Sequence, residues 1–305
     1  MSLLSQKHLQ NEEDAYAWVE AHIWPEGPVC PHCQEKERVS KMQGKATRTG
    51  LYKCYACRKQ FRVTVGTIFE KSHVPLHLWL QAFYLIAGSK KGISANQLHR
   101  TLGVTLKTAW FVGHRIREAM RSGSLKPPMS GEGGVVEVDE TYFSQKRDVK
   151  KPKGGYRHKH AVLSLVERGG EVRSFHIDNS TAKEITPIVN ANVAKEAKIM
   201  TDDGRHYIKQ FGEFASHDTV RHSLGEYVVG QVHTNTVEGY FSIFKRGMKG
   251  VYQHCSEKHL HRYLAEFDFR YNNRVRLGVN DEQRAVRMLK GAKGKRLTYQ
   301  TTGRA

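Results

Sequence analysis

Residues 135–143, VVEVDETYF, mark a change in the sequence from a helical to an extended pattern, and we predict a β-strand there. The segments KHAVLSLVER (159–168) and EVRSFHI (171–177) are predicted to be two further strands, joined through a pair of glycines as a hairpin. A predicted helix, TAKEITPIVNANV (181–193), precedes a short predicted strand, AKIMTDD (197–203). Helices fill much of the remainder, so this order predicts an α/β layer in which helices flank a mixed sheet.

Two acidic residues end strands of this predicted sheet. Asp139 follows VVEV and Asp202 follows KIMT, so adjacent parallel strands would bring the two carboxylates together. Ionised carboxylates in one place repel each other unless a cation binds between them, and Mg²⁺ is a hard divalent ion that prefers oxygen ligands. The alternative is an exposed strand end, since Glu137 and Glu140 flank Asp139 and Asp203 flanks Asp202.

The segment HTNTVEGYFSIFKRGMKG (233–250) is predicted to be a helix with an apolar and a polar stripe. The apolar stripe consists of Val237, Phe241, Phe244 and Met248, and the polar stripe of Asn235, Glu238, Ser242 and Lys245. Glu238 would supply a third carboxylate to the magnesium site. Asn235 either caps the helix or offers its carbonyl oxygen to the metal, and Lys245 either is solvated or contacts a DNA phosphate.

The charge of the chain points to a polyanionic partner. Its 305 residues include 49 Lys or Arg and 30 Asp or Glu, a formal charge of +19. One basic patch spans residues 244–305 and another spans the loop QKRDVKKPKGGYRHKH (145–160). Each patch taken alone is also explained by a solvated surface, but two patches that flank one region favour phosphate contacts.

The sequence also bears on where the protein works. It has no run of 18 apolar residues, which argues against a membrane span. The beginning, MSLLSQKHLQNEEDAY, lacks the pattern of a secretory signal, so we expect a cytoplasmic protein.

Four of the five cysteines form two CxxC pairs that predict a zinc ribbon. The pairs are Cys30 with Cys33 in CPHC and Cys54 with Cys57 in CYAC. Two such turns can place four thiolates tetrahedrally around one structural Zn²⁺, and disulfides are the poorer explanation in a cytoplasmic chain. By contrast, the scattered histidines lack tight ligand spacing, so a second zinc site is not predicted; those considered are His217, His222, His233 and His254.

A set of helices is predicted between the ribbon and the strands. SANQLHRTLG (94–103) and VTLKTAWFVGHRIREAMR (104–121) are two of them, and Thr105 is expected to cap the second. This layout is typical of a helix-turn-helix that reads DNA, with plain packing of a helical subdomain as the alternative. The DNA contacts expected on the second helix are Lys107, Thr108 and Arg115.

With these motifs the chain resembles the zinc-ribbon DDE transposases of bacterial insertion sequences, over residues from about 15 to 275. The resemblance is carried, in the family's order, by CPHC…CYAC, GTIFEKSHVPLHLW, VEVDETYF, KIMTDD and HTNTVEGYFSIFKRGMKGVYQHCSEKHLHRYLAEFDFRYNNR. It implies an RNase H-like catalytic domain whose acidic triad binds two Mg²⁺, for which Mn²⁺ can substitute. It also implies cleavage at the ends of the element and transfer of the freed 3′-hydroxyl to target DNA.

The resemblance assigns roles to individual residues. The first and second carboxylates of the triad fall on Asp139 and Asp202. The family uses either Asn or Glu at the third position, and we expect Glu238 there with Asn235 assisting. Lys245 matches the family's basic residue seven positions after Glu238. Further DNA contacts are expected at Arg246, Lys249, Lys150 and Lys151.

The expected organisation is multidomain. It comprises a zinc ribbon (1–70), a helix-turn-helix-like domain (71–122), a linker (123–134), an RNase H-like domain (135–275) and a basic C-terminal tail (276–305). The expected partners are double-stranded DNA, as terminal inverted repeats and as target, and further copies of the chain in a dimer or larger assembly at the nucleoid; no nucleotide cofactor is expected. Two alternatives stay open: a zinc-ribbon regulator that binds DNA without catalysis, and an RNase H-like nuclease that cuts without joining.

Overall fold

The computed structural model describes residues 5–123, 126–147, 149–226 and 228–298. They divide into two compact units, which we describe separately. Unit 1 consists of Met1–Arg121 and Asn280–Ala305, and unit 2 consists of Ser122–Val279. Residues 124–125 of the predicted linker and 299–305 of the predicted tail lie outside the described residues.

The ribbon of unit 1 is a small antiparallel sheet with the order β1-β2-β3. Its strands are β1 (Val39–Lys41), β2 (Tyr52–Cys54) and β3 (Gln60–Phe61). Its core is small: the buried side chains are Tyr52, Phe61 and two cysteines, and partly buried Trp24, Val39, Cys57 and Val65 pack against them. Such a core is too small to hold a fold by hydrophobic burial alone, and this is the situation in which a bound metal supplies the missing stability.

Helix α1 (Glu12–Ile23) packs on the ribbon and connects it to the rest of unit 1. Gly50 lies against the ring of Tyr16, where a Cβ would come within 2.2 Å of a ring carbon, and it has a φ of +68°. Glu20 accepts a hydrogen bond from the Tyr52 hydroxyl at 2.9 Å. These contacts fix the helix to the hairpin.

The remaining helices of unit 1 pack around an apolar centre. They are α2 (Leu76–Gly88), α3 (Ala95–Leu102), α4 (Leu106–Met120) and α8 (Asp281–Lys290). Helix α3 ends at Gly103, which has a φ of +65°, and the side chain of Thr105 accepts a hydrogen bond from the backbone N–H of Thr108 at the start of α4, as expected. Helices α3 and α4 lie where the sequence places them; a role in reading DNA stays a prediction.

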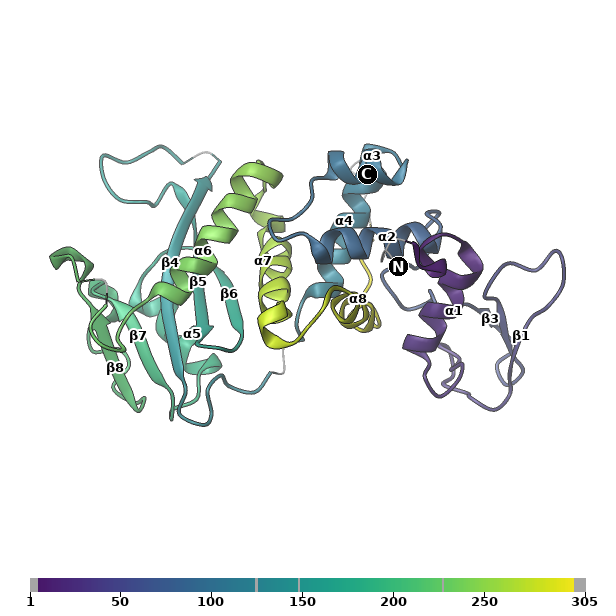
Figure 1. Ribbon diagram of the computed structural model, residues 1–305, viewed down its shortest axis with the longest axis horizontal. Coiled ribbons are helices and arrows are strands. Elements are labelled where there is room, and N and C mark those ends of the chain that lie inside the picture. The colour runs from purple at the N-terminus through teal and green to yellow at the C-terminus, as the bar shows by residue number, and fades with distance from the viewer. Residues whose placement is uncertain (1–4, 124–125, 148, 227, 299–305) are drawn as a thin grey trace, which may run out of the picture. The chain divides into compact units, whose positions relative to one another are not determined.

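The C-terminal segment differs from a basic tail. Figure 1 shows the yellow helix α8 among the blue helices α2 and α4. Asn280 and Gln283 form a capping box at its start, and Ala285, Met288 and Leu289 are buried. The many Lys and Arg residues made the apolar side of this helix hard to recognise in the sequence. That apolar side packs in unit 1, to which the segment from Asn280 belongs.

Unit 2 is built on a mixed sheet with the strand order β6-β5-β4-β7-β8. The strands are β4 (Val135–Gln145), β5 (Lys159–Glu167), β6 (Val172–Ile177), β7 (Lys198–Asp202) and β8 (Ser216–Val220). Strands β4, β5 and β6 pair antiparallel, whereas β7 pairs parallel with both β4 and β8. Strand β8 was not predicted, because SHDTV contains a single strongly apolar residue.

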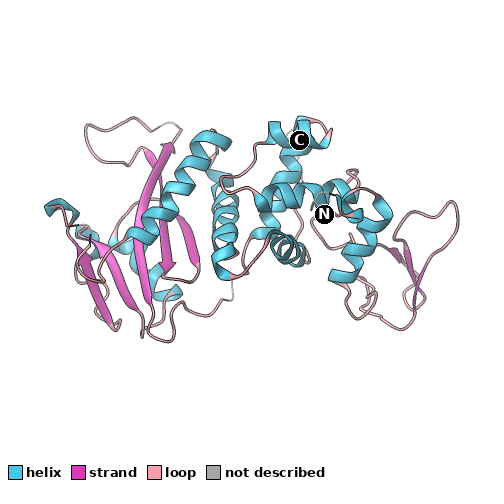
Figure 2. Ribbon diagram, viewed as in Figure 1, coloured by secondary structure: helices cyan, strands magenta, loops and turns pink. Residues whose placement is uncertain are grey.

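Helices cover both faces of this sheet (Figure 2). Helix α5 (Ala182–Asn192) shares a core with Val136 and Val138 of β4 on one face. Helices α6 (Asn235–Gly247) and α7 (Glu257–Asn272) share a core with Val162 and Val166 of β5 on the other. We call this second side the α6 face. Because side chains alternate along a strand, Glu137 and Asp139 also belong to the α6 face.

The two stripes predicted for α6 are confirmed. The apolar stripe, Val237, Phe241, Phe244 and Met248, is buried, and the polar stripe, Asn235, Glu238, Ser242 and Lys245, is exposed. A π-helical turn, Met248–Tyr252, follows α6. In α7, fully buried Glu266 accepts hydrogen bonds from Arg270 and Tyr252. Glu266 is therefore structural.

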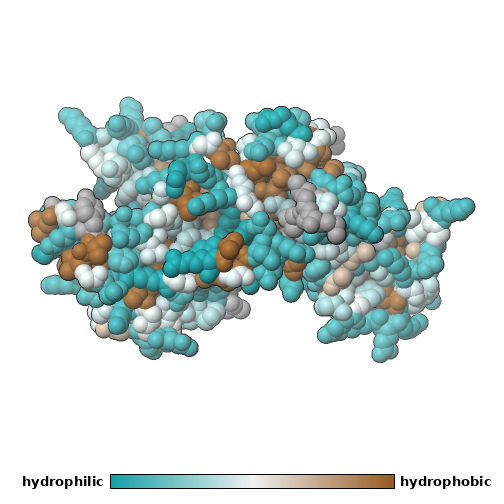
Figure 3. Space-filling model, viewed as in Figure 1, coloured by the Kyte–Doolittle hydropathy of each residue, from teal (hydrophilic) through white to brown (hydrophobic). Residues whose placement is uncertain are grey.

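Short 3₁₀ turns occur at Lys7–Leu9, Arg205–Tyr207, His222–Leu224 and Val275–Leu277. The surface visible in Figure 3 is mostly hydrophilic, with hydrophobic residues in small separate groups. No helix in the described part of the chain is long and apolar enough to cross a membrane.

Candidate functional site

Asp139 and Asp202 lie at the same level on neighbouring parallel strands. In the register of β4 and β7, Glu137 is opposite Met200, and each aspartate comes two residues later on its strand. Both therefore project from the α6 face at one edge of the sheet. Asp139 accepts a hydrogen bond from the backbone N–H of Glu140 at 2.7 Å, and Asp202 accepts one from Gly204 at 3.0 Å.

Neighbouring negative charges act on Asp139. Burial raises the pKa of Asp139 well above its usual range, and the negative charges of Glu140, Asp202 and Glu238 raise it further. A group of acids in this situation binds protons or cations, since either relieves the repulsion. A divalent cation would favour the ionised form of all of them.

Glu238 is in the first turn of α6, on its exposed side. Its Oε1 accepts a hydrogen bond from the Thr234 hydroxyl at 2.9 Å, and Nε2 of His222 is 3.8 Å from the same oxygen. Asn235 is the first residue of α6 and is exposed. The N-cap position belongs to Thr234, so Asn235 does not cap the helix.

The carboxylate that holds the start of α6 is Glu137, whose role the sequence analysis missed. Glu137 is fully buried and accepts hydrogen bonds from the backbone N–H groups of Thr236 at 2.8 Å and Val237 at 2.9 Å. Arg168 donates to it at 2.6 Å, and Nδ1 of His233 is 3.2 Å away. A carboxylate is stabilised by the N–H groups at a helix N-terminus. Glu137 thus attaches α6 to β4 two residues before Asp139.

Glu140 occupies the opposite face of β4 from Asp139. Its Oε1 is 2.9 Å from Nε2 of His206, and this hydrogen bond raises the pKa of His206. A Cβ on Gly204 would lie 2.9 Å from the His206 ring and 3.0 Å from Asp202 Oδ1. The turn after β7 therefore brings His206 and Asp202 together without room for a side chain at position 204.

The basic residues predicted to contact DNA in unit 2 are exposed. Lys245, Arg246 and Lys249 are exposed on α6 and the turn that follows it. Lys150 and Lys151 are exposed in the loop between β4 and β5. Exposure makes all of these side chains available to phosphate groups.

In unit 1 the residues predicted to contact DNA differ in their exposure to solvent. Lys107 is exposed in the first turn of α4, and the hydroxyl of Thr108 is 2.8 Å from that of Thr105. Arg115 is only 5% exposed and donates to the carbonyl oxygens of Ile68 at 2.7 Å and Leu297 at 3.0 Å. The prediction that Arg115 contacts DNA is therefore not supported, because its guanidinium donates hydrogen bonds to backbone carbonyls within unit 1.

The four ribbon cysteines form one cluster. Cys30 and Cys57 have their Sγ atoms 3.7 Å apart, Cys33 and Cys54 have theirs 3.6 Å apart, and all four sulfurs lie within 4.8 Å of one another. A backbone hydrogen bond from Cys57 lowers the pKa of Cys54 to about 7, which favours the thiolate that binds metal. This four-thiol arrangement fits a tetrahedral structural Zn²⁺.

Comparison with known proteins identifies both regions. Residues 131–272 match the ISXO2-like transposase domain, and residues 10–60 match the transposase zinc-ribbon domain. A protein of Halobacterium salinarum described as an uncharacterized protein in transposable element ISH50 is 28% identical over 263 residues, which span 81% of this chain and 86% of that protein. Among solved structures, a pre-cleavage Mos1 transpososome matches 65% of this chain and 77% of its own chain, with 11% identity and a TM-score of 0.20.

Proposed function

Because the chain belongs to the zinc-ribbon transposases of insertion sequences, we propose that it is a DDE-type DNA transposase. It cuts DNA at the ends of its element and joins the freed 3′-hydroxyl to target DNA by in-line attack on a phosphodiester. Unit 2 is its RNase H-like catalytic domain, and Asp139, Asp202 and Glu238 are the acidic triad.

The observation that supports this proposal is the common level of Asp139 and Asp202 on adjacent parallel strands. Asp139 and Asp202 come from adjacent parallel strands, and the charge of Glu238 reaches Asp139 from α6. The chain position of Glu238 is far from both, but the buried contact between Glu137 and the start of α6 brings it to this edge of the sheet. Glu137 is thus a positioning residue for the triad.

The donor set fits magnesium. It consists of carboxylate oxygens, with the amide oxygen of Asn235 one turn before Glu238, and Mg²⁺ binds oxygen ligands of this kind. When bound, Mg²⁺ or Mn²⁺ activates a water or 3′-hydroxyl as the nucleophile and neutralises charge on the leaving oxygen. Asp139 and Asp202 would hold the ions from the sheet, Glu238 would hold them from the helix, and Asn235 would assist.

DNA contacts follow from the distribution of positive charge. Lys245, Arg246 and Lys249 continue the polar side of α6 beyond Glu238, where they contact the DNA backbone beside the scissile phosphate. Lys150 and Lys151 contact phosphates from the loop after β4. The ribbon and the helix-turn-helix-like pair α3–α4 recognise the inverted repeats, with Lys107 and Thr108 at the start of α4.

The reaction also implies an assembly. Two element ends must be joined to one target, so the protein acts as a dimer or a larger assembly on DNA. It works in the cytoplasm, at the nucleoid.

A strand-transfer assay tests the proposal. The purified full chain is incubated with Mg²⁺, DNA carrying the element's terminal repeats and a plasmid target, beside Asp202→Asn and the matched variant Asp203→Asn on the adjacent exposed residue. We expect joined product from the parent and from Asp203→Asn. The rate of strand transfer by Asp202→Asn should be lower than that of the parent by at least about 10²–10³-fold. This is the scale expected when one charge-stabilising group is removed from an active site.

Other outcomes separate the alternatives. Specific binding to the repeats with no cut or joined product from the parent would favour a DNA-binding regulator. Cut ends that never appear in joined product would favour a nuclease. Equal activity of Asp202→Asn and the parent would remove Asp202 from the mechanism.

A further inference from the structure

A second group of metal-ligating side chains lies in unit 2 away from the acidic triad. It consists of His160 near the start of β5, His176 near the end of β6 and Glu257, the first residue of α7. His176 pairs with Val162, so both histidines project from the α6 face and are diagonal neighbours there. These three residues are separated by up to 97 positions in the chain, which is why no ligand spacing appears in the sequence.

The three side chains are close enough to share one ion. A ring nitrogen of each histidine and a carboxylate oxygen of Glu257 all lie within 4.8 Å of one another. Nε2 of His176 is 3.8 Å from Oε1 of Glu257, and the two imidazole rings are 5.7 Å apart between centroids. Ligand atoms around a tetrahedral zinc are about 3.3 Å apart, given bonds of about 2.0–2.1 Å. Small side-chain rotations would bring these groups to that separation.

Each of the two histidines has a ring nitrogen shielded from solvent. His160 is only 4% exposed, and its Nδ1 is buried without a hydrogen-bond partner among the described residues. Nε2 of His176 is likewise buried and makes no hydrogen bond within the described part of the chain. Buried polar atoms are almost always satisfied in folded proteins, by protein groups, water or ions. Two histidines, each with an unsatisfied buried ring nitrogen, lie in one cluster with a carboxylate, and this combination points to a ligand.

We propose that His160, His176 and Glu257 bind one divalent transition-metal ion, with Zn²⁺ as the preferred ion. Two imidazoles and a carboxylate form a zinc-ligand set, and a water completes the four-coordinate shell. Mg²⁺ is not expected here, because it prefers an all-oxygen shell. The site is independent of transposition chemistry and distinct from the cysteine ribbon.

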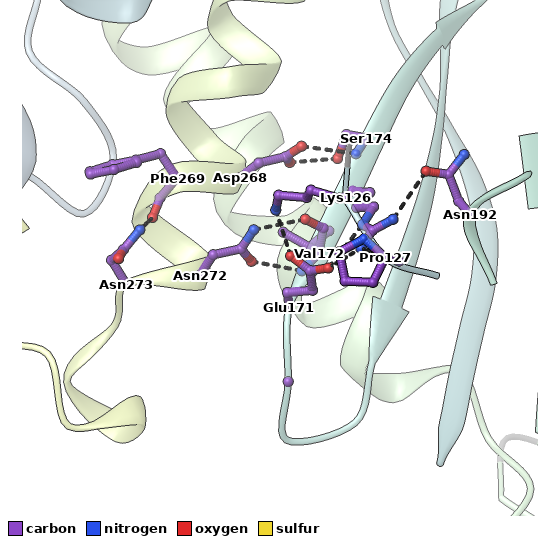
Figure 4. A network of polar contacts seen from close by, with 12 residues as sticks. Lys126, Pro127, Glu171, Val172, Ser174, Asn192, Asp268, Phe269, Asn272 and Asn273 are labelled. Atoms are coloured by element: carbon purple, nitrogen blue, oxygen red, sulfur yellow. Dashed lines mark hydrogen bonds and ion pairs between the residues drawn. The ribbon is translucent and has the colours of Figure 1, made fainter. Parts of the chain in front are cut away.

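The position of the site indicates what the ion does. Helix α7 runs along β6, and hydrogen bonds hold the C-terminal half of the helix to the strand (Figure 4). Asn272 bonds both the N–H and the carbonyl of Val172, at 2.7 and 2.9 Å, and Asp268 accepts from the hydroxyl of Ser174 at 2.7 Å. The ion provides the corresponding connection at the other end, where α7 begins beside His176.

The N-terminus of α7 has room for such a connection. Its N-cap residue, Ser256, makes no side-chain capping hydrogen bond. The carboxylate of Glu257 is about half exposed, so an ion can reach it from solvent. A bound ion would therefore fix the first turn of α7 and the edge strand β6 together.

Metal titration of the full chain tests this proposal. Zinc is added to the parent and to His176→Gln, Glu257→Gln and the matched control His254→Gln, an exposed histidine outside the cluster. Bound zinc is counted by mass spectrometry of the metal after gel filtration, and the affinity of the second equivalent is measured by competition with a chelator. Glu257→Gln keeps the experiment decisive if His176→Gln fails to fold, because Glu257 is on the surface.

We expect two equivalents of zinc per chain in the parent and in His254→Gln. In Glu257→Gln and His176→Gln the second equivalent should bind at least about tenfold more weakly, because loss of a group that merely orients a metal ligand already costs about 10–100-fold in affinity. Cobalt in the second site should show no thiolate charge-transfer band, and the second equivalent should slow hydrogen exchange in β6 and the first turn of α7. One equivalent in every protein, or a second one that neither variant weakens, would overturn the proposal.

Discussion

The zinc ribbon of unit 1 and the proposed carboxylate site of unit 2 are both sets of candidate metal ligands, but their residues are distributed differently along the sequence. The ribbon takes its ligands from two short turns, 24 positions apart at their first cysteines, Cys30 and Cys54. The carboxylate site takes Asp139, Asp202 and Glu238 from two strands and a helix spread over about 100 positions. In the ribbon, metal binding by the cysteines is itself what stabilises the fold. The proposed carboxylate site instead lies on a sheet that is folded without the metal.

This difference concerns what the metal stabilises. The ribbon has a core of a few side chains, so it needs an ion bound to its four thiols to remain folded. Unit 2 has large cores on both faces of its sheet, and its carboxylates repel one another without an ion. Metal binding should therefore fold the ribbon in unit 1 and reduce the electrostatic repulsion between carboxylates in unit 2.

The largest expected effect is on the ribbon. Cys54→Ser removes a buried ligand, so zinc should leave the four-thiol site and residues 10–60 should unfold, while unit 2 keeps its structure. Hydrogen exchange measured segment by segment checks this. Cys255→Ser is the control, since Cys255 lies outside the ribbon, and it should leave the exchange of residues 10–60 unchanged; protection of the ribbon in Cys54→Ser would contradict the account.

The next effect concerns the residue that positions α6. Glu137→Ala leaves Arg168 and the N–H groups at the start of α6 without their partner, which should cost about 3–5 kcal/mol of unfolding free energy. Denaturant unfolding of unit 2 measures the change. Glu137→Gln, which keeps the shape and one acceptor oxygen, should lose less. Equal losses in both variants would show that the negative charge, rather than the shape of the side chain, holds the helix.

A smaller effect separates two basic residues of α4. Arg115→Ala should cost about 3 kcal/mol of stability in unit 1, because buried carbonyl oxygens lose their donor. Lys107→Ala should leave stability nearly unchanged and weaken binding to DNA of any sequence, with a lower salt dependence. Thermal unfolding and DNA binding at several salt concentrations measure both. A loss of DNA affinity in a still stable Arg115→Ala would restore Arg115 as a DNA contact.

The smallest effect is the pH dependence of the carboxylate site. The pKa of Asp139 in the folded chain is raised above its ordinary value of 3.8, so the folded state holds this proton to a higher pH than the unfolded chain does. Without Mg²⁺, unit 2 should lose stability as pH rises from about 4 through the raised pKa. Added Mg²⁺ at ten times its Kd should restore about 1.4 kcal/mol at pH 8 and less at pH 5.

Thermal unfolding with and without Mg²⁺ at the two pH values checks this prediction. Asp139→Asn carries no ionisable group at this position, so it should lose most of the dependence on both pH and Mg²⁺. If Asp139→Asn responds to Mg²⁺ as the parent does, the ion binds elsewhere.

The sequence predicts what depends on local pattern. The CxxC pairs predict the ribbon, the cap at Thr105 predicts the start of α4, and the two stripes predict the orientation of α6. The parallel pairing that brings Asp139 to the level of Asp202 was also expected from the strand ends, and the register of β4 and β7 agrees with it.

What the sequence did not predict depends on contacts between distant positions. The sequence pattern suggests that Arg115 is an exposed helix arginine, but contacts with the distant residues Ile68 and Leu297 bury it. Glu137 reads as one of several acids near Asp139, although a Glu between valines in a buried strand was a signal that it has a partner. His160, His176 and Glu257 share no motif, because the sheet and α7 alone bring them together.

The most direct test of the carboxylate site is a crystal structure of the full chain with Mn²⁺, with anomalous scattering used to locate the ion. The account predicts a peak between Asp139 and Asp202, within about 2.0–2.6 Å of their oxygens and of Glu238. If the ion at this peak is bound by Asn235 and not by Glu238, Asn235 is the third ligand. No peak between Asp139 and Asp202, at concentrations that support activity, would contradict the central claim that these carboxylates hold the catalytic metal.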